Sequence, residues 1–206
     1  LIAPVSPSKI LCVGRNYRAH AKEMGGDVPS EPLLFLKPPS SLLDPGGTVQ
    51  LPPESSRVEH EGELGVVIAT GGRRIPRERA LDHVFGYIVC CDVTARDLQR
   101  KDGQWTRGKG FDTFCPVGAE IVTGIDPGAL RLRVWVGEEL RQDGNTADMV
   151  FDVATLVAYA SNVMTLHPGD LILTGTPEGV GPLVSGDSLR IEIEKIGALC
   201  IQIASA

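Results

Sequence analysis

The sequence predicts a mixed α/β fold that is mostly β, with a few short helices at its periphery. Its 24 glycines and 15 prolines among 206 residues indicate many turns, which are typical of strand-rich folds. Apolar runs of strand length recur between these turn residues. With 42% hydrophobic and 22% charged residues, the chain has a globular composition and the length for one well-buried core. We expect one domain over residues 1–206, in which about the first 50 residues are the least regular part.

The expected elements follow from these apolar runs and from the residues that interrupt them. Strands are predicted over 10–13, 33–37, 49–51, 57–69, 85–91, 117–122, 131–136, 139–142, 171–174, 188–194 and 199–203. Helices are predicted over 17–24, 76–83 and 152–164, the last with Asp152 as its N-cap. Segment 92–100 is expected to be a short helix or a loop. Segments 103–112 and 175–182 are expected to be glycine-rich loops.

Charge, hydropathy and cysteine usage exclude several classes of protein. The net charge of −6 and the pI near 5.2 argue against nucleic-acid binding, which needs a basic surface. No apolar stretch reaches about 18 residues, so no membrane span is expected, and the first residues do not resemble a signal peptide. The five cysteines include no C-x-x-C pair, which argues against a disulfide framework or a zinc site and makes a reducing cytoplasm the expected location.

A cluster of acidic residues is the strongest chemical signal in the chain. Glu59, Glu61 and Glu63 alternate along a predicted strand and therefore share one face, and Asp92 ends the apolar strand 85–91. Carboxylates without thiolates or imidazoles are the ligands of a hard cation, so we expect Mg²⁺, with Mn²⁺ or Ca²⁺ as alternatives. Spacing does not decide which two glutamates bind the ion. The alternative is that the three glutamates form the solvated face of an edge strand.

Three further positions carry side chains suited to catalysis. His20 and Glu23 lie three residues apart on a predicted helix, where a carboxylate can orient an imidazole as a base for water. Lys109 lies between two glycines, which allow a ligand to approach closely. The hydroxyl of Thr176 and the surrounding backbone N–H groups can hold a carboxylate. The alternatives are a surface helix pair and plain flexible loops.

Several long motifs occur in one order along nearly the whole chain, from about Lys9 to Ile203. They are Val13-Gly14-Arg15-Asn16-Tyr17, Glu31-Pro32-Leu33-Leu34-Phe35-Leu36-Lys37-Pro38, His60-Glu61-Gly62-Glu63-Leu64-Gly65, Asp92-Val93-Thr94-Ala95-Arg96-Asp97-Leu98-Gln99 and Thr174-Gly175-Thr176-Pro177-Glu178-Gly179. In these motifs the sequence resembles the fumarylacetoacetate hydrolase family, in its short single-domain acylpyruvase branch. The resemblance implies a β-roll-like fold, usually in a homodimer whose active site lies near the shared interface.

The resemblance also implies a role for each candidate residue. Glu61, Glu63 and Asp92 would bind the metal, and Glu59 would lie outside its ligands. His20 and Glu23 would activate water from a lid helix, and Lys109 would stabilise an oxyanion. The residues implied to hold the substrate are Arg96, Gln99 and Thr176.

The expected activity is metal-dependent hydrolysis of a C–C bond in an acylpyruvate, a 1,3-diketo acid, to pyruvate and a carboxylate. Relatives of the same family decarboxylate oxaloacetate-like acids or isomerise 2-hydroxyhepta-2,4-diene-1,7-dioate, and both reactions remain alternatives. The presence of His20 and Glu23 favours hydrolysis, because decarboxylation needs no activated water. A more remote alternative is a metal-stabilised binding module without enzymatic activity.

Overall fold

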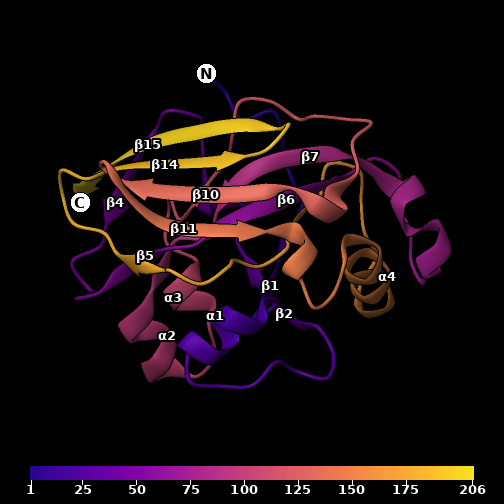
Figure 1. Cartoon of the computed structure of the whole chain (residues 1–206), viewed down its shortest axis with the longest axis horizontal. Coiled ribbons are helices and arrows are strands. Elements are labelled where there is room, and N and C mark those ends of the chain that lie inside the picture. Colours follow the sequence, from indigo (N-terminus) through magenta and orange to yellow (C-terminus); the bar gives the residue numbers. More distant parts are fainter.

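Two five-stranded sheets form the framework of the chain in a computed structural model that describes residues 1–206 (Figure 1). The first sheet has the order β2-β1-β12-β6-β7, with bounds Leu33–Lys37, Ile10–Gly14, Leu171–Leu173, Gly62–Ile68 and Val84–Cys91. The second has the order β11-β10-β14-β15-β4, with bounds Glu139–Asn145, Arg131–Val136, Ser188–Ile193, Gly197–Ser205 and Thr48–Leu51. The expectation of a mostly β fold with short helices is confirmed.

Short strands and helices complete the chain. The short strands are β3 (Leu42–Leu43), which pairs with β9 (Cys115–Pro116), and β5 (Val58–His60), which lies between β13 (Gly181–Pro182) and β8 (Thr94–Ala95). The α-helices are α1 (Arg18–Glu23), α2 (Arg96–Asp102), α3 (Thr106–Lys109) and α4 (Val153–Val163). The 3₁₀ helices are η1 (Pro39–Ser41), η2 (Arg77–His83), η3 (Pro127–Ala129) and η4 (Thr146–Asp148). Figure 1 shows α1, α2 and α3 gathered below the sheets, while α4 lies at one side.

The main hydrophobic core lies between the two sheets. Strand β14 alternates exposed and buried residues, so only one of its faces enters this core. Every residue of β6 is buried, because a second apolar cluster, which includes Ile10 and Leu171, covers the other face of the first sheet. The central strands of the first sheet are therefore enclosed on both sides, and polar side chains at their ends are withdrawn from water.

The predicted continuous strand over 57–69 is broken at Glu61. Strand β5 ends at His60 and pairs with β13 and β8, whereas β6 begins at Gly62 and pairs with β7 and β12. The chain passes from one sheet to another here because Gly62 lies directly against the second sheet. A Cβ atom at Gly62 would be 2.4 Å from Cγ2 of Val134, so only glycine permits this approach.

Three other segments differ from their predicted structure. The predicted strand over 117–122 is wrong, because this segment meets β7 only through the isolated bridges of Val117 with Cys90 and of Val122 with Tyr87. The predicted loop over 103–112 contains the helix α3, which places Lys109 in its last turn. The predicted helix over 76–83 is the 3₁₀ helix η2. No helix of the structure has the length and apolar character needed to cross a membrane.

Candidate active site

Three carboxylates meet where β6 begins and β7 ends. Glu63 lies on β6, Glu61 immediately precedes that strand, and Asp92 immediately follows β7. Antiparallel pairing of Gly62 with Cys91 places the two ends together, and the N–H of Asp92 donates to the carbonyl of Glu61 at 2.9 Å. One carboxylate oxygen from each acid lies within 4.8 Å of the other two. The cluster is therefore built by strand pairing between two segments about 30 residues apart.

Two lysines and an arginine neutralise part of this cluster. Lys37, from the end of β2, donates to Oδ1 of Asp92 at 2.6 Å. Lys109 donates to Oε2 of Glu61 at 2.8 Å and also to Asp92. Burial alone raises the pKa of Glu61, but Lys109 and Arg96 outweigh burial and hold this pKa below its usual range. Glu61 and Asp92 are therefore both paired with cations.

Glu63 has no cationic partner. Its Oε2 accepts a hydrogen bond from the N–H of Gly175 at 2.6 Å, and its side chain is buried. Burial, followed by repulsion from Asp92 and Glu61, raises the pKa of Glu63 well above its usual value. A buried carboxylate of this kind is stable only when it is protonated or when a cation binds beside it. A purely carboxylate donor set suits Mg²⁺ or Mn²⁺, so Glu61, Glu63 and Asp92 fit a divalent ion.

Glu59 lies outside the group of three acids that could hold a metal ion. Its Oε1 accepts from Arg57 at 2.6 Å and its Oε2 accepts from Arg96 at 2.7 Å. Burial opposes ionisation of Glu59, but the two arginines outweigh it and lower the pKa. The break at Glu61 places β5 and β6 in different sheets. Glu59 and Glu63 therefore do not share one face of a continuous strand.

His20 and Glu23 form a hydrogen-bonded pair on α1. Nδ1 of His20 lies 3.1 Å from Oε2 of Glu23, and Oε1 of Glu23 accepts from the N–H of Gly179 at 3.0 Å. When Nδ1 carries the proton that it donates to Glu23, Nε2 of His20 is free to accept another. His20 lines the same pocket as Glu61 and Glu63. The pair is therefore placed to act as a base at the pocket wall.

The three predicted substrate-binding residues line the pocket but already have partners within the chain. Arg96 donates to Glu59, to Glu61 and, at 2.7 Å, to Oε1 of Gln99. The hydroxyl of Thr176 donates to the carbonyl of Gly62 at 2.8 Å. Arg96 thus braces Glu61 while Gln99 holds Arg96. Any contact of these side chains with substrate is made from a framework that is already ordered.

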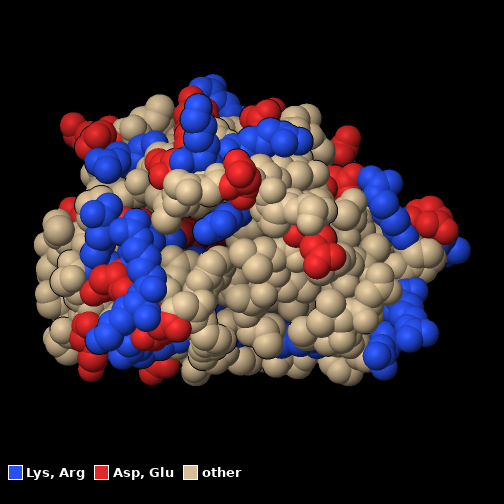
Figure 2. Space-filling view, turned by 90° about the horizontal axis from the view of Figure 1, so that it is seen from below, with Lys and Arg blue, Asp and Glu red and all other residues tan.

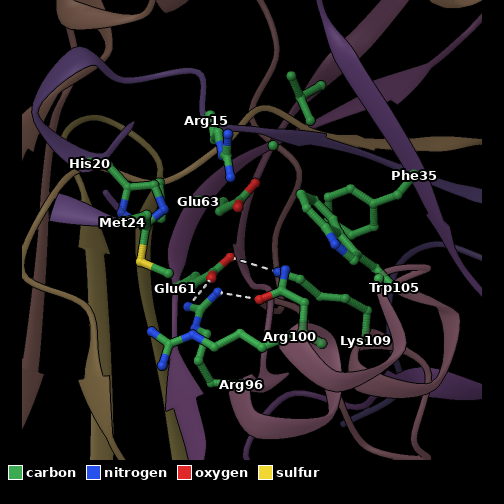
Figure 3. A pocket seen from close by; sticks show the side chains of 15 residues that line it. Arg15, His20, Met24, Phe35, Glu61, Glu63, Arg96, Arg100, Trp105 and Lys109 are labelled. Carbon is green, nitrogen blue, oxygen red and sulfur yellow. Dashed lines mark hydrogen bonds and ion pairs between the residues drawn. The ribbon is translucent and has the colours of Figure 1, made fainter. Parts of the chain in front are cut away.

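The cavity has a volume of about 250 Å³, enough for a small organic acid. Figure 3 shows His20 and Met24 on one side, Phe35 and Trp105 on the other, and Glu61 and Glu63 between them. The rings of Phe35 and Trp105 meet edge to face with centroids 5.1 Å apart. Figure 2 views the molecule from below, where charged side chains of both signs surround a hollow in the face.

Several pocket residues were not singled out as site residues from the sequence. The side chains of Arg15 and Arg100 line the cavity and form no ion pair within the chain. Arg15 also has a φ of 56°, which is uncommon for a residue other than glycine. Lys37, which contacts Asp92 and does not line the cavity, could have been found from the sequence, because a charge that ends an apolar strand is the pattern that pointed to Asp92.

Known proteins resemble this chain along nearly its whole length. Residues 9–204 match the family model described as fumarylacetoacetate (FAA) hydrolase C-terminal. The oxaloacetate tautomerase FAHD1 of Arabidopsis thaliana, a mitochondrial protein, is 48% identical over 192 residues, which are 90% of this chain and 86% of that protein. The mitochondrial oxaloacetate decarboxylase of Dictyostelium discoideum is 47% identical over 192 residues, which are 90% and 88% of the two chains.

Solved structures show the same fold. A 5-carboxymethyl-2-hydroxymuconate delta-isomerase from Mycobacterium smegmatis has a TM-score of 0.94 and 48% identity, covering 100% of this chain and 82% of that one. A fumarylpyruvate hydrolase from Pseudomonas aeruginosa, solved with Mn²⁺ and pyruvate, has a TM-score of 0.91 and 36% identity, covering 98% and 91%. The chain belongs to the fumarylacetoacetate hydrolase family.

Proposed function

We propose that the chain is a divalent-metal-dependent enzyme that acts on an oxaloacetate-like 2-oxo acid through its enolate. The reaction is either interconversion of the keto and enol forms or loss of the carboxyl group at carbon 4. The observation that carries this proposal is the unpaired, buried Glu63 beside Glu61 and Asp92, which calls for a further cation at the pocket floor. Relatives named as an oxaloacetate tautomerase and an oxaloacetate decarboxylase support this substrate class over the acylpyruvate expected from the sequence.

The carboxylates Glu61, Glu63 and Asp92 would hold the ion, and we propose Mg²⁺ or Mn²⁺. A bound divalent cation would supply a Lewis acid for the carboxylate and 2-oxo oxygens of the substrate. The Mn²⁺ and pyruvate in the Pseudomonas aeruginosa structure support this choice, since pyruvate is itself a 2-oxo acid.

Lys109 stabilises negative charge that develops on the substrate. Burial lowers the pKa of Lys109, but Asp92 and Glu61 outweigh burial and raise the pKa overall, so the side chain stays protonated. Its Nζ also lies 4.9 Å from the centroid of Phe35, which fixes it against the pocket wall. A buried, preorganised cation favours the enolate over the keto form.

The unpaired Arg15 and Arg100 supply positive charge elsewhere along the pocket lining. An oxaloacetate-like acid has a second carboxylate, and guanidinium groups bind carboxylates well. An oxaloacetate-like dicarboxylate is small enough to fit in the 250 Å³ cavity. The proton that is moved between carbon 3 and solvent during tautomerisation is carried by His20, whose Nε2 is free while Nδ1 is held by Glu23.

Hydrolysis of an acylpyruvate is the second candidate, and the tethered His20–Glu23 pair favours it. A carboxylate that holds an imidazole on one side and a backbone N–H on the other is arranged to activate water. In that reaction His20 takes a proton from water, the hydroxide attacks the distal carbonyl, and the C–C bond breaks to release a carboxylic acid and the enolate of pyruvate. Lys109 stabilises the tetrahedral oxyanion.

A direct comparison of substrates tests both proposals. The protein is stripped with EDTA, reloaded with Mg²⁺ or Mn²⁺, and assayed with enol-oxaloacetate by loss of enol absorbance, with keto-oxaloacetate by pyruvate formation, and with acetylpyruvate. The proposal expects metal-dependent turnover of oxaloacetate that exceeds turnover of acetylpyruvate in kcat/KM. Turnover of acetylpyruvate alone would assign the hydrolase reaction, and turnover of neither would reject both.

A further inference from the structure

Gln142 is the only buried residue of β11, and it is fully buried. Its strand lies at the edge of the second sheet, outside the sheet that carries the acidic cluster. We propose that Gln142 is a positioning residue that holds Thr176 and the following loop in place for substrate binding. This inference rests on the function proposed above and adds a residue from a different sheet to its site.

Both the oxygen and the nitrogen of the Gln142 side-chain amide have hydrogen-bond partners within the chain. Its Oε1 accepts from the N–H of Gly62 at 3.0 Å, and Nδ1 of His60 lies 3.3 Å away. Its Nε2 donates to Oγ1 of Thr176 at 2.8 Å and to the carbonyl of Pro177 at 2.7 Å. Because the N–H of Gly62 can only donate and the carbonyl of Pro177 can only accept, these two backbone groups determine which way the amide points.

The contact with Thr176 determines the direction of its hydroxyl. Oγ1 of Thr176 accepts from Gln142 and donates to the carbonyl of Gly62, so its single proton is already in use. The backbone N–H of Thr176 forms no hydrogen bond within the chain, although the residue is buried and lines the pocket. The preceding N–H, of Gly175, donates to Glu63. Gln142 therefore fixes a segment that offers an unused backbone donor beside the metal-binding carboxylates.

The loop after Thr176 packs tightly on the same strand. A Cβ atom at Gly144 would be 2.5 Å from Cβ of Pro177, and one at Gly179 would be 2.0 Å from the carbonyl oxygen of Arg141. The N–H of Gly179 in turn donates to Glu23. Strand β11 thus supports both the substrate-facing part of the loop and the part that holds the His20–Glu23 pair.

The test compares Gln142→Met with the matched control Gln202→Met, which makes the same chemical change at an exposed position of β15. The probe is oxalate, a planar dianion similar to the enolate of pyruvate, titrated by calorimetry into Mn²⁺-loaded protein. Gln142→Met removes the donors to Thr176 and Pro177 while filling similar volume. We expect its dissociation constant for oxalate and its KM for oxaloacetate to rise about tenfold, as the loss of about one hydrogen bond gives. Mn²⁺ binding should change little, and the control should behave as wild type.

A double-mutant cycle with Thr176→Val separates positioning from a general structural effect. If Gln142 acts through Thr176, the double variant binds oxalate about as weakly as Thr176→Val alone; if the two residues are independent, the effects add. Unchanged oxalate affinity in a folded Gln142→Met protein, or additive effects in the cycle, would overturn the proposal.

Folding of the variant is monitored by thermal melting. If Gln142→Met does not fold, Gln142→Glu replaces it, because this variant keeps the acceptor for Gly62 and loses donors to Thr176. Failure of both variants to fold would assign Gln142 a purely structural role and would also overturn the proposal. Wild-type protein that neither binds oxalate nor turns over a 2-oxo acid would instead count against the proposed function.

Discussion

Lys109 donates a hydrogen bond to Glu61 across 2.8 Å, although the two residues are 48 positions apart in the sequence. Both side chains are buried, and the same ammonium also contacts Asp92. One cation therefore contacts two of the three carboxylates that could hold a metal ion, and it also lines the pocket. This arrangement gives Lys109 two separable effects, one on metal affinity and one on catalysis.

Lys109→Met should separate these effects. Turnover should fall about 100-fold or more, because a preorganised cation is lost from the site of developing charge. Affinity for Mn²⁺ should rise, because a competing positive charge leaves Glu61 and Asp92. Without Mn²⁺ the variant should melt at a lower temperature than wild type, since two buried carboxylates lose a partner. Calorimetric Mn²⁺ titration, melting curves and steady-state rates measure these effects.

Lys101→Met is the matched control, because Lys101 lies on α2 and is exposed. It should leave all three measurements unchanged. A Lys109→Met protein with wild-type turnover would remove Lys109 from the mechanism.

His20→Ala should distinguish the reactions that need a base from the one that does not. Acylpyruvate hydrolysis and oxaloacetate tautomerisation should slow by about 100-fold or more, as loss of a general base gives. Decarboxylation of keto-oxaloacetate should change by less than about tenfold, because it needs no proton abstraction. Affinity for Mn²⁺ should remain near that of wild type. Equal losses in all three reactions would show that His20 acts on substrate binding rather than as a base.

Gly62→Ala should destabilise the protein through overpacking between the sheets. The new methyl group would lie 2.4 Å from Cγ2 of Val134, at the residue between Glu61 and Glu63. The expected loss is about 1–3 kcal/mol in the free energy of unfolding, measured by chemical denaturation. Gly118→Ala is the control, because a methyl group there would meet its nearest atom at 3.5 Å, an ordinary contact. Equal stability of the two variants would contradict the close packing described for Gly62.

Asp97 should make folding sensitive to acid. Burial raises the pKa of Asp97, but hydrogen bonds from Ser55 and Ser56 outweigh burial and lower the pKa to about 2, compared with 3.8 for an ordinary aspartate. A lowered folded-state pKa stabilises the protein above the unfolded value, and the stabilisation is lost as the pH falls toward about 2. Asp97→Asn should therefore lower the melting temperature at pH 6 and converge on wild type near pH 2. A constant difference at every pH would reject this role.

The acidic centre could be predicted from the sequence to a useful extent. Alternation and the position of a charge at the end of an apolar strand were enough to nominate Glu61, Glu63 and Asp92, which the structure brings together. They were not enough to set Glu59 apart, because its separation depends on the break in the strand at Glu61. That break results from contact between Gly62 and Val134 on another sheet. The residues around Gly62 in the sequence do not indicate this contact, because Val134 is far away along the chain.

The residues that support the site were harder to predict for the same reason. Lys37 contacts Asp92 although β2 and β7 are the two edge strands of the first sheet, and Gln142 contacts Thr176 from the second sheet. Such contacts depend on tertiary arrangement, whereas a glutamine in an edge strand looks like an ordinary solvent-facing residue. The predicted strand over 117–122 failed similarly, since its apolar residues pack against the core with only two bridges to β7.

The central claim is that Glu61, Glu63 and Asp92 hold a divalent ion that turnover of a 2-oxo acid requires. The most direct test titrates Mn²⁺ into EDTA-stripped protein while binding and oxaloacetate turnover are followed together, for wild type, Glu63→Gln and Glu59→Gln. We predict one ion per chain, activity that rises with occupancy by the ion, loss of binding and activity in Glu63→Gln, and Mn²⁺ binding near that of wild type in Glu59→Gln. Full activity in the stripped protein, or wild-type Mn²⁺ affinity in Glu63→Gln, would contradict the central claim.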